Sequence, residues 1–223
     1  MERVVEPEWL DELPPDDPRA RRSRADLRRI NGLMNNAGLI ASEMRKIQNL
    51  TRVLDLGAGD GAFALRLAQK LARPNTEFLL VDRIGGLSSR VRERFNALNC
   101  AVQFHLCDAL TGLGEVGHVD VAFVNLFLHH FHETELNQLL ATVAARCRVF
   151  IACEPRRSSF ALFASRGVGL IGCNDVTRHD AVVSVRAGFH GNELSRLWPD
   201  ASRWKLTEKP AGLFNHLFMA QRQ

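Results

Sequence analysis

Adjacent histidines are the clearest candidates for chemistry in this sequence of 223 residues. They lie in the segment 125–132 (N-L-F-L-H-H-F-H), which follows an apolar run. An imidazole gains or loses a proton near neutral pH, so His129 or His130 could act as a general base toward a hydroxyl group. The alternatives are a packed or capping pair, or a loop that holds part of a ligand. We predict no metal site, because His129, His130 and His132 lack the i, i+4 spacing of zinc ligands and no cysteine or acid stands at ligand spacing.

A glycine turn, 55–61 (D-L-G-A-G-D-G), is the second such segment. The apolar run 52–56 before it predicts a buried strand, and the periodicity after it predicts a helix over 60–72. Gly57 and Gly59 can take positive φ and let a ligand approach bare backbone N–H groups. The turn departs from the dinucleotide fingerprint G-x-G-x-x-G, because Ala62 replaces the third glycine. Asp55, two residues before the first glycine, can bind a cationic or amino-bearing ligand.

A second acid follows at the end of the next predicted strand, 77–82. Asp82 comes about twenty residues after the glycines, where a carboxylate in a nucleotide-binding fold accepts hydrogen bonds from both ribose hydroxyls. The alternative is a turn or helix cap. The negative charge argues against NADP, whose 2′-phosphate it would repel.

Strand and helix patterns alternate from residue 51 onward, which predicts an α/β fold with a parallel sheet covered on both faces. Further strands are expected over 101–106, 119–125 and 148–153, and a closing hairpin over 203–207 and 213–220. Ligands of such sheets lie beyond the carboxyl ends of the strands, where the strand order reverses. We expect 52–56 and 119–125 to flank that point. Ahead of the sheet we expect an extended arm over 1–18 and two helices, 19–30 and about 33–48.

Composition narrows the function classes. Apolar residues make up 46% of the chain, enough for a core, and no apolar run approaches the ~20 residues of a membrane span. The chain begins without a hydrophobic signal segment, and its five cysteines lack C-x-x-C spacing, so we expect reduced thiols and a cytoplasmic location. The arginine-rich segment 19–29 is interpreted as a solvated helix face rather than an RNA-binding patch, because it has no interleaved aromatic residues.

The glycine turn resembles motif I of the class I S-adenosylmethionine (SAM) methyltransferases. The histidine segment is similar to the corresponding strand exit of ubiquinone/menaquinone-biosynthesis methyltransferases and their natural-product relatives. This resemblance implies a Rossmann-like seven-stranded, mostly parallel sheet with helices on both faces, an antiparallel last strand and N-terminal lid helices. It divides the chain into an arm with lid helices, 1–48, and a SAM-dependent methyltransferase domain, 49–223.

The resemblance also implies residue roles. Asp108 would receive the adenine amino group and Ala109 would offer its N–H to the ring. The full set expected to bind SAM is Asp55, Gly57, Ala58, Gly59, Asp82, Arg83, Asp108, Ala109 and Asn125. The segment 175–189 would lie across the mouth of the cleft, where Arg178, His179 and Arg186 would bind an acidic or phenolic substrate.

The predicted function is methyl transfer from SAM to a small molecule, with an oxygen of a phenolic, quinone-like or polyketide compound as first choice and His129 or His130 as base. Carbon methylation of a similar ring, RNA methylation, a SAM-binding scaffold and a NAD-dependent oxidoreductase are the alternatives. We expect no nucleic-acid partner, and the sequence leaves the oligomeric state open.

Overall fold

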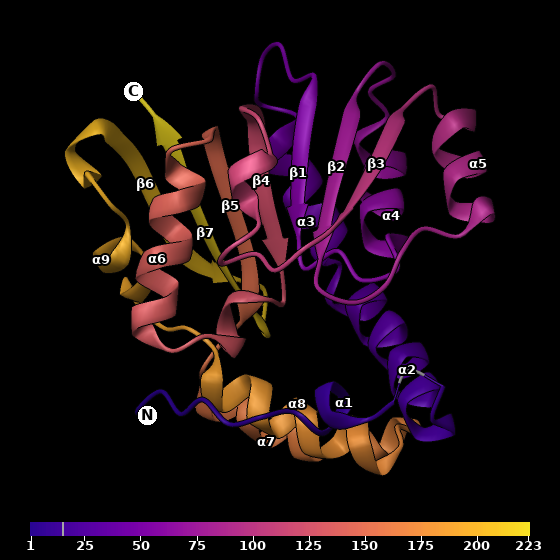
Figure 1. The fold of residues 1–223 in the computed structure, drawn as a ribbon. Coiled ribbons are helices and arrows are strands. Elements are labelled where there is room, and N and C mark those ends of the chain that lie inside the picture. The colour runs from indigo at the N-terminus through magenta and orange to yellow at the C-terminus, as the bar shows by residue number, and fades with distance from the viewer. Residues whose placement is uncertain (15) are drawn as a thin grey trace.

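The computed structural model describes residues 1–14 and 16–223 and is built around one seven-stranded sheet (Figure 1). The strand order is β3-β2-β1-β4-β5-β7-β6, and β7 runs antiparallel to both of its neighbours while the other pairs are parallel. This confirms the predicted fold class, including the closing hairpin. The strands are β1 (Arg52–Leu56), β2 (Glu77–Asp82), β3 (Ala101–Leu106), β4 (Val119–Asn125), β5 (Cys147–Pro155), β6 (Trp204–Ala211) and β7 (Asn215–Arg222).

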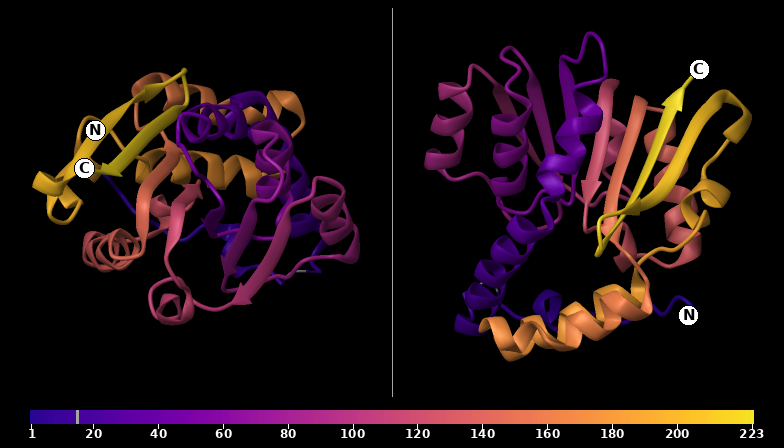
Figure 2. Two further views of the ribbon diagram at one scale, coloured as in Figure 1. Left: turned by 90° about the horizontal axis from the view of Figure 1, so that it is seen from above. Right: turned by 180° about the vertical axis from the view of Figure 1, so that it is seen from behind.

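Helices cover both faces of the sheet and enclose two apolar cores (Figure 2). Successive strand residues point to opposite faces, so Leu54 and Leu56 join one core while Val53 joins the other. α6 (Glu133–Ala144) and α9 (Glu193–Leu197) pack on the first face. The second face carries α3 (Asn36–Met44), α4 (Ala62–Leu71) and α5 (Ser89–Ala97).

A separate layer lies below the carboxyl ends of the strands in Figure 1. It contains α1 (Trp9–Glu12), α2 (Pro18–Met34), α7 (Ser159–Arg166) and α8 (Asp175–Ala187), with the short 3-10 helix η3 (Val168–Ile171) between the last two. Segments from both ends of the chain meet here, since α8 contacts α1, α2 and α7. This layer closes the edge of the sheet at which a ligand is expected.

The N-terminal helices differ from their predicted bounds. Asn35 adopts the left-handed conformation (φ 53°) and separates α2 from α3, three to four residues later than the predicted break at 31–32. α3 packs against α4 and the sheet, so it belongs to the sheet layer rather than to a lid. Among the described residues, no helix combines the length and apolarity needed to cross a membrane.

Asp120 ties three strands together at the sheet edge away from the glycine turn. Its carboxylate accepts hydrogen bonds from the backbone N–H groups of Thr51 and Arg52, from the Thr51 hydroxyl and from Arg148. Burial works against the charged form, but these hydrogen bonds prevail and hold the pKa of Asp120 below 3.8.

We therefore predict that Asp120→Ala lowers the free energy of unfolding by about 1–3 kcal/mol, because several donors lose their acceptor. Urea denaturation at pH 7 checks this. The difference in free energy of unfolding between wild type and Asp120→Ala should shrink below about pH 4, where the wild-type carboxylate becomes protonated and loses its charge. Equal denaturation midpoints at pH 7 would contradict the assigned role.

Candidate active site

A cavity of about 1140 Å³ lies beyond the carboxyl ends of β1 and β4, where the strand order reverses. Ligand cavities usually hold roughly 300–1,000 Å³, so this one has room for two small molecules side by side. All nine residues expected to bind SAM line it, and so do His129 and His130. The structure therefore brings together residues that the sequence separates by up to 75 positions.

The glycine turn holds itself against β2. Gly57 and Gly59 have φ values of 76° and 56°, as expected for this tight turn. The N–H groups of Gly57 and Ala58 donate to the carbonyl of Val81, and the N–H of Gly59 donates to Asp82 Oδ2 at 2.7 Å. The expectation that bare N–H groups at Gly57 and Gly59 meet the ligand is wrong here, because these amides already have partners within the loop.

Asp55 carries a buried carboxylate that is set up for a cation. Its residue is 2% exposed, and its Oδ2 atom has no hydrogen-bond partner in the part of the chain that is described. Burial and the nearby Asp82 raise the pKa of Asp55 well above its usual value. A buried carboxylate without a partner is costly, so binding of a positively charged group here would be favoured.

Two further acids at strand ends have defined backbone partners. Asp82 accepts from the N–H of Ile84 through Oδ1 as well as from Gly59. Asp108 accepts from the N–H of Leu110 at 2.7 Å. Both side chains therefore have fixed orientations and still line the cavity.

Glu154, at the end of β5, organises the histidine loop. This fully buried carboxylate accepts hydrogen bonds from the N–H groups of Phe127, Leu128 and His129, and from His129 Nδ1 at 2.8 Å. The loop reaches it because Leu126 takes a left-handed conformation (φ 54°), which is rare outside glycine and concentrated at functional sites. Sequence reasoning did not include Glu154 in the site, although its place at a strand exit was visible.

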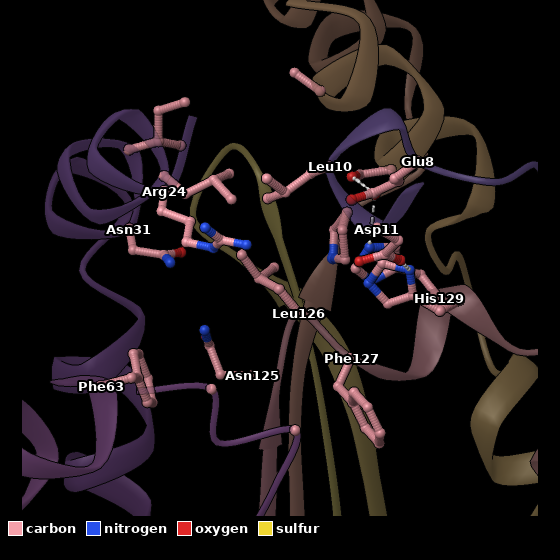
Figure 3. A pocket seen from close by; sticks show the side chains of 18 of the residues that line it. Glu8, Leu10, Asp11, Arg24, Asn31, Phe63, Asn125, Leu126, Phe127 and His129 are labelled. Carbon is pink, nitrogen blue, oxygen red and sulfur yellow. Dashed lines mark hydrogen bonds and ion pairs between the residues drawn. The ribbon is translucent and has the colours of Figure 1, made fainter. Parts of the chain in front are cut away.

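His129 lies between two carboxylates. Its Nδ1 atom faces Glu154, and its Nε2 atom lies 3.4 Å from Glu8 Oε1 (Figure 3). Burial disfavours the imidazolium, but the hydrogen bonds and charges of Glu154 and Glu8 outweigh it and raise the pKa of His129 to about 9. Glu8 shows the complementary effect: burial opposes its charge, yet His129 lowers its pKa to about 2. At pH 7 His129 is therefore a cation and has no vacant nitrogen for a proton.

The surroundings of His130 favour its neutral form, in contrast to those of His129. Its ring lies against that of His129, with 4.2 Å between centroids, and its Nδ1 atom is 3.6 Å from Asp11 Oδ2. Burial and the charge of His129 lower the pKa of His130 below its usual value of 6.5. Of the two predicted base candidates, only His130 is thus a neutral imidazole at pH 7, and it lines the cavity.

The N-terminal arm forms one wall of the cavity, which the sequence did not indicate. Arg3 donates to the carbonyls of Phe131 and Ala187, and Val4 N–H donates to the carbonyl of Arg186. Further along, the N–H groups of Trp9 and Leu10 donate to Asp180, and Glu8 accepts from Ser184. An apparently extended acidic segment therefore supplies a site residue, Glu8, through many separate contacts.

The predicted substrate residues lie away from the cavity. Arg178, His179 and Arg186 sit on α8, whose lining residues are Ala181, Ser184 and Val185. His179 stacks on Trp9 and contacts Asp180, while Arg186 lies 3.9 Å from Glu6. α8 does lie across the site, but its small and apolar side chains face the cavity. Its charged side chains instead contact the N-terminal arm or point to solvent.

Three potential metal ligands also meet in this region. Glu8, His129 and His130 offer ligand atoms within 4.8 Å of one another. An ion there would have to displace the proton on His129 Nε2, which faces Glu8. The imidazolium already pairs with both Glu8 and Glu154, which favours an ion pair over a metal site.

The arginine-rich helix α2 is largely ion-paired. Arg22 and Arg29 contact the buried Asp26, and Arg28 lies 3.7 Å from Asp60. The two pairs with Asp26 lie within α2, and Arg28–Asp60 joins the helix to the glycine turn, which agrees with a structural use of these charges.

Comparison with known proteins identifies a domain family and solved structures that resemble this chain. Residues 53–149 match the sequence model of a methyltransferase domain. This stretch of the chain is similar to methyltransferase domains. No curated protein sequence matches the chain significantly.

Solved structures of methyltransferases share its fold at low sequence identity. The plantazolicin methyltransferase BpumL, determined with S-adenosylhomocysteine (SAH), has a TM-score of 0.67 at 14% identity, covering 93% of this chain and 92% of that one. A putative O-methyltransferase from Nostoc punctiforme gives 0.62 at 19% identity, covering 99% and 64%. The mitomycin 7-O-methyltransferase MmcR gives 0.60 at 17% identity, covering 96% of this chain and 60% of that one.

SAM is the methyl donor of this class, and the cavity fits it. SAM carries an ammonium and a sulfonium group, which suit the buried carboxylate of Asp55. Asp82 would hold the ribose hydroxyls, and Asp108 with Ala109 would hold the adenine. The cavity is lined by both charged and apolar residues, which matches a ligand of this mixed chemistry.

We predict that Asp82→Ala weakens SAH binding by about 100-fold or more. The change removes the ribose acceptor and also releases Gly59, and hydrogen bonds to charged groups contribute about 1.5–3 kcal/mol each. Calorimetric titration with SAH measures the loss, with NADH as a control ligand. Asp120→Ala is the control protein, since it should bind SAH normally. Unchanged SAH affinity in Asp82→Ala would refute the cofactor assignment.

A second prediction concerns the arm. Glu8→Gln removes the charge opposite His129, so we expect amide exchange to accelerate by about tenfold or more at Val4, Trp9 and Leu10. Hydrogen exchange at pH 7 with mass-spectrometric detection measures it. Glu6→Gln is the matched control, because the contact of Glu6 with Arg186 is exposed to solvent. Equal exchange in all three proteins would mean that the arm does not depend on this ion pair.

Proposed function

We propose that this methyltransferase transfers the methyl group of SAM to a hydroxyl oxygen of an apolar aromatic acceptor, with His130 as general base. The observation that carries the proposal is the electrostatic division between the two histidines. His129 is held as an imidazolium by Glu8 and Glu154, and burial together with this charge lowers the pKa of its neighbour His130.

The chemistry that SAM supplies is an electrophilic methyl group on a positively charged sulfur. An attacking hydroxyl must give up its proton, and the neutral imidazole of His130 can accept it near neutral pH. The paired cation at His129 lies beside it, so it would also favour the developing oxyanion. Most of the rate enhancement would come from the enclosed cavity, which holds the two reactants in line.

The acceptor class follows from the walls that surround His130. Beyond the cofactor residues, the arm, α2, η3 and the loop after β4 line the cavity with mostly apolar side chains, among which stand the charged residues Glu8, Asp11, Arg24 and Arg28. The apolar side chains include Leu10, Leu13, Leu27, Ile30, Phe127, Phe131, Val168 and Ile171. An apolar ring system with an ionisable hydroxyl matches this lining. Phenolic, quinone-like or polyketide compounds belong to this chemical class.

The fold relatives give this proposal independent support. BpumL acts on plantazolicin, as its name states, and MmcR is described as an O-methyltransferase of mitomycin. Both names denote small natural products. At sequence identities of 14% and 17%, the similarity supports a shared fold and not a shared acceptor. The acceptor of this chain is therefore inferred from its own cavity.

The test combines an acceptor screen with a pH profile. Phenolic acceptors are incubated with SAM, and product structure by NMR separates oxygen from carbon methylation. For wild type, we predict that kcat/KM rises with pH and levels off, with the midpoint below pH 6.5, because protonated His130 cannot act as a base. His130→Gln should lower kcat by about 10²–10⁴-fold and abolish this acid limb.

His129→Gln provides the matched comparison. Losing the imidazolium removes one cause of the lowered pKa of His130, so the acid limb should move to higher pH while some activity remains. SAH affinity should be close to wild type in both variants if their fold is intact. An unaltered pH profile in His130→Gln would overturn the assignment of the base.

A further inference from the structure

The outer face of α7 and η3 carries a cluster of exposed apolar side chains. Phe160 and Phe163 on α7 are 53% and 74% exposed, and Leu170 and Ile171 on η3 are 94% and 51% exposed. We call these four residues the lid patch. Water-exposed apolar side chains that gather on one element usually mark a contact surface rather than ordinary surface variation.

The surroundings of the lid patch are basic. Residues 155–174 contain no aspartate or glutamate and three arginines, of which Arg157 is buried and paired with Glu193, and the exposed Asp175 follows directly. Arg166 ends α7 three residues after Phe163, which places both on one helix face. Two arginines from other elements approach as well: Arg22 donates to the carbonyl of Gly172, and the side chain of Arg178 lies beside Gly169.

The lid patch is continuous with the cavity. Ile171 belongs to both, since it lines the cavity and is half exposed. Phe160 stacks on Phe214 with 5.8 Å between ring centroids, and Phe214 also lines the cavity. Ala161, Ala164 and Val168 face inward from the same two helices. An apolar molecule at the lid patch would therefore have a continuous apolar path to the site.

We propose that the lid patch inserts into the surface of an anionic lipid bilayer, with its arginines at the headgroups. Aromatic and aliphatic side chains flanked by arginines are the composition of interfacial membrane-binding segments, and each arginine near an anionic surface adds attraction. A second copy of this chain is a poorer fit, because two-fold pairing would bring the arginines of both patches together. The route into the cavity, which rests on the proposed function, would deliver a lipophilic acceptor from the bilayer.

Co-sedimentation of the full chain with vesicles tests the membrane contact without any need for activity. We expect binding to vesicles that contain phosphatidylglycerol, weakened by added salt, and at least about tenfold weaker binding to pure phosphatidylcholine. The double substitution Phe163→Asp with Leu170→Asp should reduce binding to the anionic vesicles about tenfold or more. Arg166→Glu should reduce it and diminish its salt dependence.

Matched controls separate the lid patch from general charge effects. Leu106→Asp with Gln221→Asp adds the same two charges at exposed sites on β3 and β7, and Arg94→Glu on α5 matches Arg166→Glu. These controls should bind vesicles like the wild type, and all variants should bind SAH normally. Light scattering of the protein alone reports its mass.

Three outcomes would overturn the proposal. The first is absence of vesicle binding at low salt, and the second is equal loss in the lid-patch and control variants. The third is a dimer that Phe163→Asp with Leu170→Asp converts to monomers, which would make the patch an interface between copies. Vesicle binding without any methyl transfer to phenols would instead leave the membrane contact standing and remove the proposed acceptor.

Discussion

The active-site region depends on the hydrogen bonds that the carboxylate of Glu154 accepts. This carboxylate is buried and accepts hydrogen bonds from four N–H groups of the loop after β4, one of them on the His129 imidazolium. Charge-assisted hydrogen bonds of this kind are about twice as strong as neutral ones, so they can hold Leu126 in its left-handed conformation. The loop geometry then fixes where Phe127 packs against Gly57 and where both histidines lie. A single acid at one strand end thus positions the base side of the cavity, where Phe127 packs against the glycine turn.

The fixed cation at His129 links the two ends of the chain. Glu154 and Glu8 together neutralise it, and Glu8 comes from an arm that no sheet element holds. Closure of the arm and the protonation state of the histidines are therefore coupled. With Glu8 in place His129 stays charged up to about pH 9, and the same charge lowers the pKa of His130. The ion pair of Glu8 and His129 thus contributes both to the arm wall and to the electrostatics of the site.

The fold and the cofactor side of the site could be predicted because their signals are local. Asp55, Gly57 and Asp82 stand at strand ends with fixed spacing, and strand ends converge in a parallel sheet. The acceptor side could not be predicted this way. Glu8 reaches His129 across 121 positions, and nothing in the acidic, proline-containing arm indicates that partner. The positions of Arg178, His179 and Arg186 could not be predicted for the same reason. We expect the charged side of their helix to face the cleft, but α8 presents Ser184 and Val185 to the cavity instead.

The layer below the sheet has a consequence for how such a protein can diversify. The matched domain, residues 53–149, supplies the glycine turn, Asp82, Asp108 and the histidines, whereas Leu10, Leu27 and Ile171 come from segments on either side of it. Strand register and packing of the two cores constrain the first group. The second group is constrained mainly by its own contacts. The choice of acceptor can therefore change through substitutions in the flanking segments, or be redesigned by exchanging them. The residues that bind the methyl donor can stay the same. Glu8 and Ser184 would have to be exchanged together, because the Ser184 hydroxyl donates to the Glu8 carboxylate.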